Sequence, residues 1–188
     1  MKVLITIVPF GEQDRLPLDL LKKSNIEYLL NPLNRKPSKE ELIDMVKDFD
    51  AIIVGTEKIS EEVINQATKL KHISRVGIGL DSVDLIAAEK KGIRVSYTPD
   101  VPAPAIAELT IGMMLTLLRS THTSNLRMHR GEWYRIFGRR LSNITIGLIG
   151  VGRVGSKVIK YIQGFDSPNI LANDVSSSVK KLGLPVKW

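Results

Sequence analysis

Residues 144–155 read Ile-Thr-Ile-Gly-Leu-Ile-Gly-Val-Gly-Arg-Val-Gly, an apolar run that passes directly into closely spaced glycines. Gly150, Gly152 and Gly155 fit the pattern G-x-G-x-x-G, which is informative when a strand precedes it and a helix follows. Gly150 permits a tight turn, Gly152 lets a pyrophosphate approach the backbone, and Gly155 allows close packing of helix on strand. The amphipathic stretch Val154–Phe165 predicts a helix whose first N–H groups face the phosphates. The stretch therefore predicts the phosphate-binding turn of a dinucleotide fold.

An acidic residue stands at the expected distance beyond this turn. The next predicted strand, Ile170–Asn173, is followed by Asp174, which lies 19 residues after Gly155. A carboxylate in this place accepts hydrogen bonds from ribose hydroxyls and repels a 2′-phosphate, so NAD is predicted as the cofactor rather than NADP. The serines of Ser176–Ser178 weaken that preference, since no arginine follows directly. The alternative is a structural β-α-β unit that binds no ligand.

The first hundred residues alternate short apolar runs with stretches of helical period. Strands are predicted at Val3–Val8, Ile26–Leu30, Ala51–Val54, His72–Val76 and Ile93–Tyr97. A helix between them starts at the capping box Ser38-Lys39-Glu40-Glu41, another is capped by Ser60, and a third runs from Val83 to Lys91. This alternation predicts a parallel sheet with helices on both faces.

Three prolines between Pro99 and Pro104 separate this region from a second one, so domains are predicted at 1–100 and 101–188. A long helix is predicted from about Ala105 to Arg119, continuing toward His129. Its most apolar part, Leu109–Leu118, falls short of a membrane span and is interpreted as buried. A last strand is a weaker expectation at Leu184–Trp188.

The composition is that of an ordinary globular protein of 188 residues with a net charge of +7 and no cysteine. The lack of cysteine excludes disulfides and thiolate metal sites, favours a reducing compartment, and leads us to expect a cytoplasmic protein. We predict no metal site and no membrane partner. Arginines alternate with aromatic residues between Arg119 and Arg140, a pattern that also occurs in nucleic-acid binding. We favour a solvated connector, because no nucleic-acid motif accompanies the charge.

With the glycine turn in place, the chain resembles the D-isomer-specific 2-hydroxyacid dehydrogenases, the family that includes phosphoglycerate dehydrogenase. The segments that carry the resemblance are Arg75-Val76-Gly77-Ile78-Gly79-Leu80-Asp81-Ser82-Val83-Asp84, Ala107-Glu108-Leu109-Thr110, Arg130-Gly131-Glu132-Trp133 and the stretch Ile146–Gly155. The resemblance implies an α/β fold, in which a flavodoxin-like substrate lobe with a parallel sheet is followed by the first part of a Rossmann NAD-binding lobe.

The resemblance also implies roles for individual residues. Backbone N–H groups around Val76, Gly77, Ile78 and Gly79 would hold the substrate carboxylate, as glycine-rich loops do for anions; a plain strand-to-helix turn is the alternative. The main chain of Arg153 and Val154 would meet the NAD phosphates. Arg75 is either a cation on the substrate side or a surface charge.

The chain departs from the family pattern in ways that bear on activity. Ser82 stands where the family usually has asparagine, and Gly55-Thr56 where many members have Arg-Ser. The catalytic arginine, glutamate and histidine of the family lie beyond residue 188 in its layout, and the histidines His72, His122 and His129 occupy other segments. We therefore assign no catalytic residue and expect a C-terminally truncated chain that is inactive alone.

The resulting functional hypothesis is an NAD-dependent oxidoreductase that transfers hydride between a small 2-hydroxy or 2-oxo acid and NAD. The alternatives are a non-catalytic NAD-binding or interaction module and one half of a split enzyme. Part of the apolar surface would lack a cover in such a short chain, so a homodimer or a complementing C-terminal segment is the expected partner.

Overall fold

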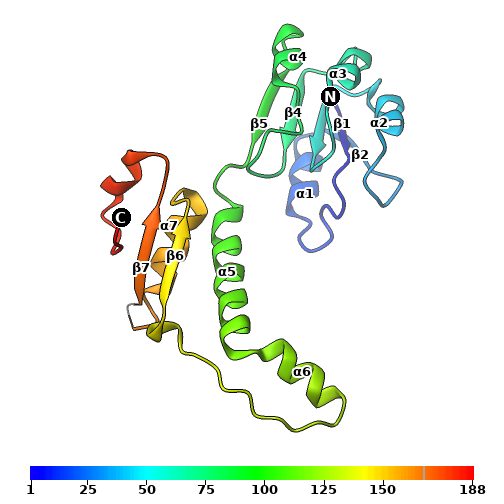
Figure 1. Ribbon diagram of the computed structural model, residues 1–188. Coiled ribbons are helices and arrows are strands. Elements are labelled where there is room, and N and C mark those ends of the chain that lie inside the picture. Colours follow the sequence, from blue (N-terminus) through cyan, green and yellow to red (C-terminus); the bar gives the residue numbers. More distant parts are fainter. Residues whose placement is uncertain (167) are drawn as a thin grey trace. The chain divides into compact units, whose positions relative to one another are not determined.

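The computed structural model describes residues 1–166 and 168–188, and the chain divides into two compact units, Met1–Val101 and Pro102–Trp188. We call them unit 1 and unit 2. Unit 1 is built on a five-stranded parallel sheet (Figure 1). Its strands are β1 (Lys2–Ile5), β2 (Glu27–Leu30), β3 (Ala51–Val54), β4 (His72–Arg75) and β5 (Arg94–Tyr97), and its helices are α1 (Leu16–Lys23), α2 (Lys39–Val46), α3 (Glu61–Gln66) and α4 (Leu85–Lys90). The strand order β2-β1-β3-β4-β5 confirms the predicted flavodoxin-like sheet.

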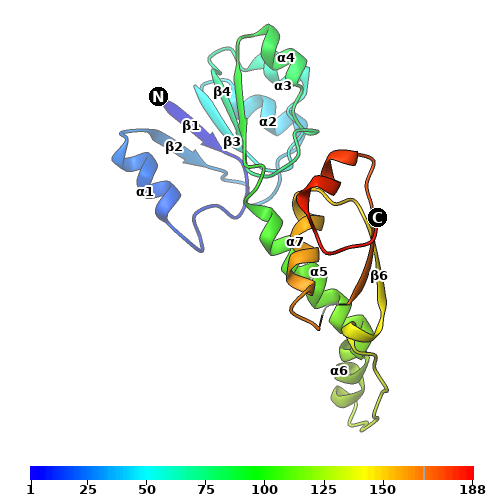
Figure 2. The same ribbon diagram turned by 90° about the vertical axis from the view of Figure 1, so that its left-hand side faces the viewer.

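The two faces of this sheet are covered unequally (Figure 2). Helices α2, α3 and α4 pack on one face, where Ile52 and Ile73 are fully buried. Helix α1 covers the other face over β1 and β3 with Leu18. Over β4 and β5 that second face is polar, and the Nε2 atom of His72 lies 2.9 Å from the Oγ atom of Ser96. The expected cover of helices on both faces is therefore complete on one face only.

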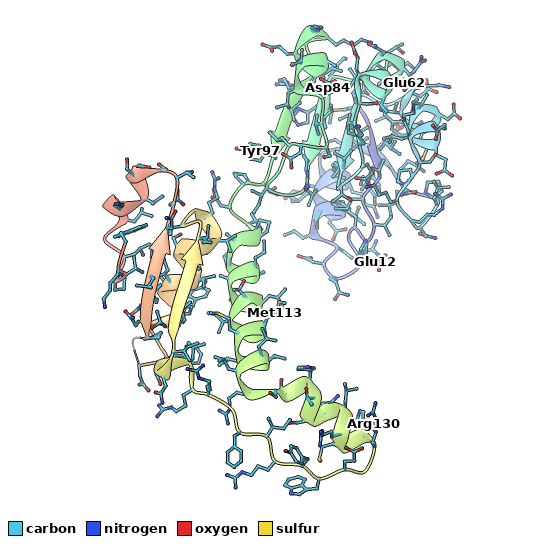
Figure 3. The ribbon with its side chains drawn as sticks, in the orientation of Figure 1. Glu12, Glu62, Asp84, Tyr97, Met113 and Arg130 are labelled. Carbon is cyan, nitrogen blue, oxygen red and sulfur yellow. The ribbon has the colours of Figure 1, made fainter. Side chains whose placement is uncertain are left out.

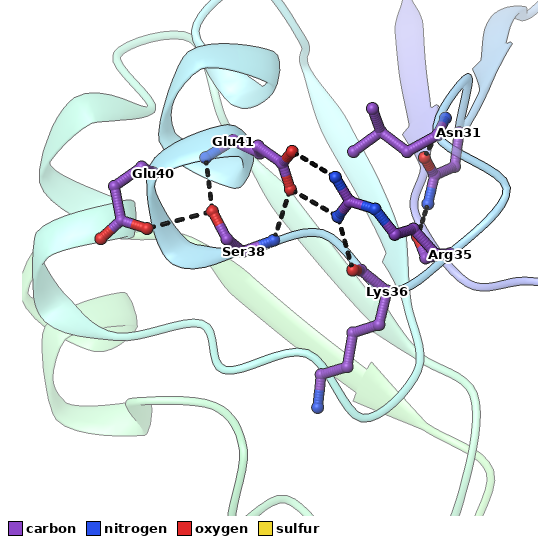
Figure 4. Close-up of polar contacts among 7 residues, drawn as sticks. Asn31, Arg35, Lys36, Ser38, Glu40 and Glu41 are labelled. Atoms are coloured by element: carbon purple, nitrogen blue, oxygen red, sulfur yellow. Dashed lines mark hydrogen bonds and ion pairs between the residues drawn. The ribbon is translucent and has the colours of Figure 1, made fainter.

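The start of α2 shows the predicted capping box (Figure 4). The backbone N–H of Glu41 donates to the hydroxyl of Ser38 at 3.2 Å, and the N–H of Ser38 donates to the Glu41 carboxylate at 2.8 Å. The guanidinium of Arg35 donates two hydrogen bonds to the same carboxylate, at 2.6 and 2.8 Å. These donors, Arg35 first and Ser38 second, lower the pKa of Glu41 to about 2.

Two other helix starts in unit 1 differ from the prediction. Ser60 stands at the N-cap of α3, but its hydroxyl makes no capping bond and is buried without a partner among the described residues. Helix α4 begins at Leu85, two residues later than predicted, because the Asp84 carboxylate accepts a hydrogen bond from the N–H of Ala87 at 2.9 Å. An N-cap acid takes extended backbone, and this fixes the first helical residue after it.

Unit 2 is built around a two-stranded parallel sheet packed against helices (Figure 2). Its elements are α5 (Pro102–Arg119), α6 (Thr121–His129), the 3-10 turn η1 (Leu141–Asn143), β6 (Thr145–Ile149), α7 (Arg153–Ile162), β7 (Asn169–Asn173) and the 3-10 turn η2 (Ser177–Leu182). Helices α5 and α7 share one core with the sheet, to which Ile111, Ile146 and Ile159 contribute. The predicted strand–turn–helix–strand order is confirmed, although α7 ends at Ile162 rather than at Phe165.

The C-terminal residues add a short third segment to the edge of this sheet, beside β7. The N–H of Ala172 donates to the carbonyl of Lys187 at 2.7 Å, and the N–H of Lys187 donates to the carbonyl of Ile170 at 2.9 Å. The contact is a parallel bridge rather than the full strand expected over Leu184–Trp188. Among the described residues, β6 therefore has β7 as its single partner, and its other edge is free.

The apolar helix α5 is half-exposed, so the predicted burial of Leu109–Leu118 is wrong for one of its faces. Leu109, Met113 and Leu117 are 63, 59 and 70 % exposed, and they follow one another at a spacing of four residues (Figure 3, where Met113 is labelled). We call these three residues the α5 stripe. The opposite face carries Ala107 and Ile111 into the core. Hydropathy alone did not distinguish the two faces, because both are apolar.

The helical segment does not run unbroken toward His129. Ser120 has a positive φ of 50°, and this left-handed residue ends α5 and starts α6. Pro102 and Pro104 lie in the first turn of α5. Residues in the first turn donate no hydrogen bond within the helix, so the N–H group that proline lacks is not needed there. Within the described residues, no helix combines the length and the apolar character that crossing a membrane requires.

Candidate functional site

The glycine turn of unit 2 lies at the carboxyl end of β6, where a tight loop leads into α7. Gly150 has a φ of 91°, a conformation that side chains of L-residues rarely adopt, and its N–H donates to the carbonyl of Asn173 at 2.8 Å. Val151 next to it is fully buried and anchors the loop in the core. Gly152 is the N-cap of α7, and the N–H of Ser156 donates to its carbonyl at 3.0 Å.

The outer side of this turn is open. A Cβ atom placed on Gly150 or Gly152 would meet no atom within 4 Å, so neighbouring side chains leave the backbone uncovered. A Cβ atom on Gly155 would instead overlap the carbonyl group of Gly150. The third glycine thus lets the helix approach the strand, and the first two leave room for a ligand. The first N–H groups of a helix have no acceptor inside the helix, and helix N-termini bind anions for this reason.

Asp174 follows β7 and lies directly beside the glycine turn. Its Oδ2 atom accepts a hydrogen bond from the N–H of Val151 at 2.7 Å, and its Oδ1 atom accepts one from the N–H of Ser176 at 2.8 Å. The donors, Ser176 first and Val151 second, lower the pKa of Asp174, so the carboxylate is charged at neutral pH. Beyond it, the hydroxyls of Ser176 and Ser178 are 2.6 Å apart.

The second candidate region is the glycine-rich loop of unit 1, at the carboxyl end of β4. The N–H of Val76 donates to the carbonyl of Val54 at 2.9 Å, and the N–H of Gly77 donates to the hydroxyl of Thr98 at 2.7 Å. These two donors are therefore engaged within the protein. Within the described residues, the N–H groups of Ile78 and Gly79 have no acceptor, so these two loop donors remain for an external anion.

Arg75 lies underneath this loop. Its guanidinium donates to the carbonyl of Val76, and it occupies the space that a side chain at residue 77 would need. The φ of Gly77 is 142°, so the backbone conformation favours glycine, whereas the end of the flexible Arg75 side chain can move aside. A hollow of about 360 Å³ opens beside the loop and is lined by Thr56, Lys58, Arg75, Gly79, Asp81 and Ser82. The hydroxyl of Ser82 is buried there without a partner among the described residues.

These geometries are shared with proteins of known class. The model of the D-isomer specific 2-hydroxyacid dehydrogenase catalytic domain matches residues 10–177. The chain belongs to the D-isomer-specific 2-hydroxyacid dehydrogenase family. A D-3-phosphoglycerate dehydrogenase of Methanocaldococcus jannaschii is 42 % identical over 141 residues, which cover 73 % of this chain and 26 % of that relative.

Solved structures share the fold of this chain. A protein of Thermus thermophilus superimposes with a TM-score of 0.85 at 29 % identity, over the whole of this chain and 59 % of its own. The 3-phosphoglycerate dehydrogenase of Entamoeba histolytica, solved with NAD⁺ bound, gives a TM-score of 0.74 at 31 % identity, over 93 % of this chain and 54 % of its own. The chain thus spans about a quarter to three fifths of the length of these relatives.

The histidines lie apart from both candidate regions of this family member. His72 starts β4 and faces Ser96, and burial, with a smaller effect of the Arg94 charge, lowers its pKa. The other two, His122 and His129, lie on α6. Within the described residues, no hydrogen bond joins any of the three to the glycine turn or to the loop at Ile78 and Gly79 in its own unit.

Sequence reasoning missed one buried acid. Glu57 follows β3 and is only 4 % exposed, and its carboxylate accepts a hydrogen bond from the N–H of Gly55 at 2.5 Å. It stands next to Gly55-Thr56, the place where many family members have Arg-Ser. The signal in the sequence was a charged residue three positions after the fully apolar strand β3, to which we assigned no role from the sequence.

Proposed function

We propose that unit 2 binds NAD at the glycine turn, and that the chain serves as part of an NAD-dependent oxidoreductase acting on a 2-hydroxy acid or the matching 2-oxo acid. The observation that carries the proposal is the turn itself. It is open over Gly150 and Gly152, closed at Gly155, and bordered by the ionised Asp174. Family membership and the NAD⁺-bound relative support the same assignment.

The residues present fit a dinucleotide in a definite way. The main chain at Gly150, Gly152, Arg153, Val154 and Gly155 would hold the pyrophosphate, since the helix N-terminus supplies N–H groups and positive partial charge. The carboxylate of Asp174 would accept hydrogen bonds from the ribose and exclude a 2′-phosphate by charge. When bound, NAD supplies the hydride acceptor, and the protein supplies its binding and orientation.

In unit 1 we propose that the substrate carboxylate binds at the glycine-rich loop of residues 76–79. Val76 and Gly77 shape the loop through their bonds to β3 and Thr98, and Ile78 and Gly79 offer the free N–H groups. The Arg75 guanidinium beneath the loop adds a positive charge. Gly55 supplies no cation at the place where many family members have arginine, but Lys58 lines the hollow beside the loop.

The decisive experiment measures cofactor binding by titrating the full chain with NADH and following its fluorescence. We expect saturable binding that Gly152→Val abolishes, because a side chain there would occupy the space of the pyrophosphate. Gly147→Ala is the matched control, since a Cβ at Gly147 also meets no atom within 4 Å but lies in β6 rather than in the turn. Equal binding by all three proteins would refute the proposal.

The exposed surfaces of unit 2 favour association as part of this function. The α5 stripe is uncovered, and Trp133 and Phe137 in the following loop are 86 and 92 % exposed. Apolar area of this kind in a folded protein marks an interaction site. We propose a homodimer, or pairing with a complementing polypeptide segment that would use the free edge of β6. Light scattering of the purified chain, alone and after co-expression with such a segment, distinguishes the two from a monomer.

A further inference from the structure

Unit 2 has a hollow at the amino end of its strands, away from the glycine turn. The hollow has a volume of about 190 Å³ and is lined by Leu115, Arg119, Arg139, Arg140, Leu141, Ser142, Phe165 and Asp166. We call it the arginine hollow. Residues 141–142 precede β6 and residues 165–166 precede β7, whereas the glycine turn follows β6. The five residues of β6 separate the arginine hollow from the glycine turn by roughly 13 Å or more.

The charges around the arginine hollow are unbalanced. Arg140 pairs with Asp166 at 2.9 Å, and Asp166 is the single acid among the lining residues. Arg119 and Arg139 have no acidic partner within the described part of the chain. Three guanidinium groups and one carboxylate leave an excess of two positive charges at one small opening. Like charges held together in this way repel one another, and an anion between them relieves the repulsion.

The backbone brings Arg119 and Arg139 to the same hollow. The N–H of Arg139 donates to the carbonyl of Leu118 at 3.0 Å, which fixes the incoming loop against the last turn of α5. A Cβ atom on Gly138 would lie 2.8 Å from that carbonyl oxygen and 2.9 Å from the Nε atom of Arg119. Glycine at this position therefore permits the close approach that brings Arg139 beside Arg119.

The size and lining of the hollow select the kind of anion. Its volume of about 190 Å³ accommodates a single phosphate group. Guanidinium groups match the oxygens of phosphate with paired hydrogen bonds. Leu115, Leu141 and Phe165 form an apolar floor that binds no counter-charge of its own. We propose that the arginine hollow is a binding site for phosphate, either free or as the phosphate group of a small monoester, independent of the cofactor turn.

The test is calorimetric titration of the full chain with inorganic phosphate at constant ionic strength. Arg139→Gln is expected to weaken binding about tenfold, the usual effect of losing one charge-assisted hydrogen bond. Asp166→Asn is expected to tighten it, because a negative charge is removed and Arg140 is released. Asn also tolerates the positive φ of 60° at this residue. Opposite effects of two exposed substitutions cannot arise from a general loss of folding.

Two further variants locate the binding. Arg15→Gln removes an exposed arginine of unit 1 and is expected to leave phosphate affinity unchanged. Gly152→Val blocks the cofactor turn, so it is expected to remove any phosphate bound at the turn and to leave unchanged the binding that Arg139→Gln weakens. Loss of that binding in Gly152→Val would place the phosphate at the turn and overturn the proposal. No change in either Arg139→Gln or Asp166→Asn would overturn it as well.

Two more ligands identify the source of the phosphate group. Glycerol phosphate that binds as tightly as inorganic phosphate, or more tightly, supports a monoester, and binding of inorganic phosphate alone supports the free ion. A single-stranded oligonucleotide that binds far more tightly than both, with a steep dependence on salt, would replace the proposal with nucleic-acid binding.

Discussion

The carboxylate of Asp174 accepts a hydrogen bond of 2.7 Å from the backbone N–H of Val151, so the acid after β7 is tied to the glycine turn after β6. In the sequence the two residues belong to different strands, and Asp174 was predicted only as a ribose ligand. In the structure it also holds the turn in place, because Val151 lies between Gly150 and Gly152, the two glycines that a pyrophosphate would approach. We call this hydrogen bond to Val151 the brace. One carboxylate therefore connects the shape of the proposed phosphate site with the position of the proposed ribose site.

This double role predicts graded effects of substitution. Asp174→Ala removes both the brace and the ribose acceptor, and we expect the affinity for NADH to fall about tenfold or more. Asp174→Asn keeps a neutral acceptor for the N–H of Val151 and removes the charge, so NADH binding should fall less and NADPH binding should rise. Fluorescence titration with both cofactors measures this. An Asn variant as weak as Ala toward NADH, with NADPH unchanged, would limit Asp174 to a charged ribose contact.

The same brace predicts how the turn responds to acid. Hydrogen bonds from Ser176 and Val151 lower the pKa of Asp174 below its value in the unfolded chain. The charged form is thus favoured in the folded protein, and its stabilisation is present above the usual carboxyl pKa of about 3.9 and is lost as the pH falls through the lower folded value. The amide chemical shifts of Val151 and Ser176 should stay constant from pH 8 to pH 5 and move together only in stronger acid. Movement near pH 6 would contradict the brace.

Gly155→Ala is predicted to disrupt unit 2 although it adds a single methyl group. The new Cβ atom would overlap the carbonyl of Gly150, and a backbone atom cannot turn aside as a flexible side chain does. We expect a loss of about 1–3 kcal/mol in the free energy of unfolding, as for other overpacked sites, together with loss of NADH binding. Gly147→Ala, which meets no neighbour, is the control for both measurements. Chemical denaturation followed by circular dichroism gives the comparison.

The elements that the sequence predicted best are those whose signals are local. The glycine turn, the capping box at Ser38 and the five strands of unit 1 each depend on residues within a few positions of one another. The double role of Asp174 was not predictable, because it depends on a contact between residues 23 apart in the chain. The burial of Glu57 was missed although its partner Gly55 is only two residues away, because the sequence of a short loop does not show which of its side chains turns inward.

Other differences arose because a local pattern had two structural outcomes. The apolar residues of α5 predicted a helix correctly, but they lie on all its sides and gave no indication that the α5 stripe would stay exposed. The break at Ser120 has no glycine or proline to mark it. The loop at Val76 and Gly77 has the composition of an anion site, yet its first two N–H groups are used by β3 and Thr98.

Two serines at helix starts provide a matched test of capping. Ser38 makes the capping bond of α2, so Ser38→Ala should lower the free energy of unfolding by about 1 kcal/mol. Ser60 stands at the N-cap of α3 without such a bond, so Ser60→Ala should have little effect or be slightly favourable. Because the pKa of Glu41 is lowered to about 2, the part of the capping box that depends on its charge persists through mildly acidic solution. Urea denaturation at neutral pH gives both values, and equal losses would argue against the role of Ser38.

The α5 stripe predicts the association state of the protein. Replacing Leu109, Met113 and Leu117 together by Gln removes the apolar surface while keeping good helix-forming residues, so the fold should persist and the stability of the monomer should change little. If this surface holds two copies together, light scattering should show a shift from dimer toward monomer, with the dissociation constant raised by orders of magnitude because three buried apolar side chains are lost.

The control for this prediction is Ile86→Gln. Ile86 on α4 is 68 % exposed, comparable to the stripe, but it lies in unit 1 and is not followed by further exposed apolar residues at a spacing of four. The control should therefore leave the association state unchanged. A wild-type chain that is already monomeric at high concentration, or a triple variant that associates as tightly as the wild type, would show that the stripe does not join two copies. In the second case the exposed aromatic residues Trp133 and Phe137 would be the next surface to substitute, because they are the most exposed aromatic side chains in the described part of unit 2.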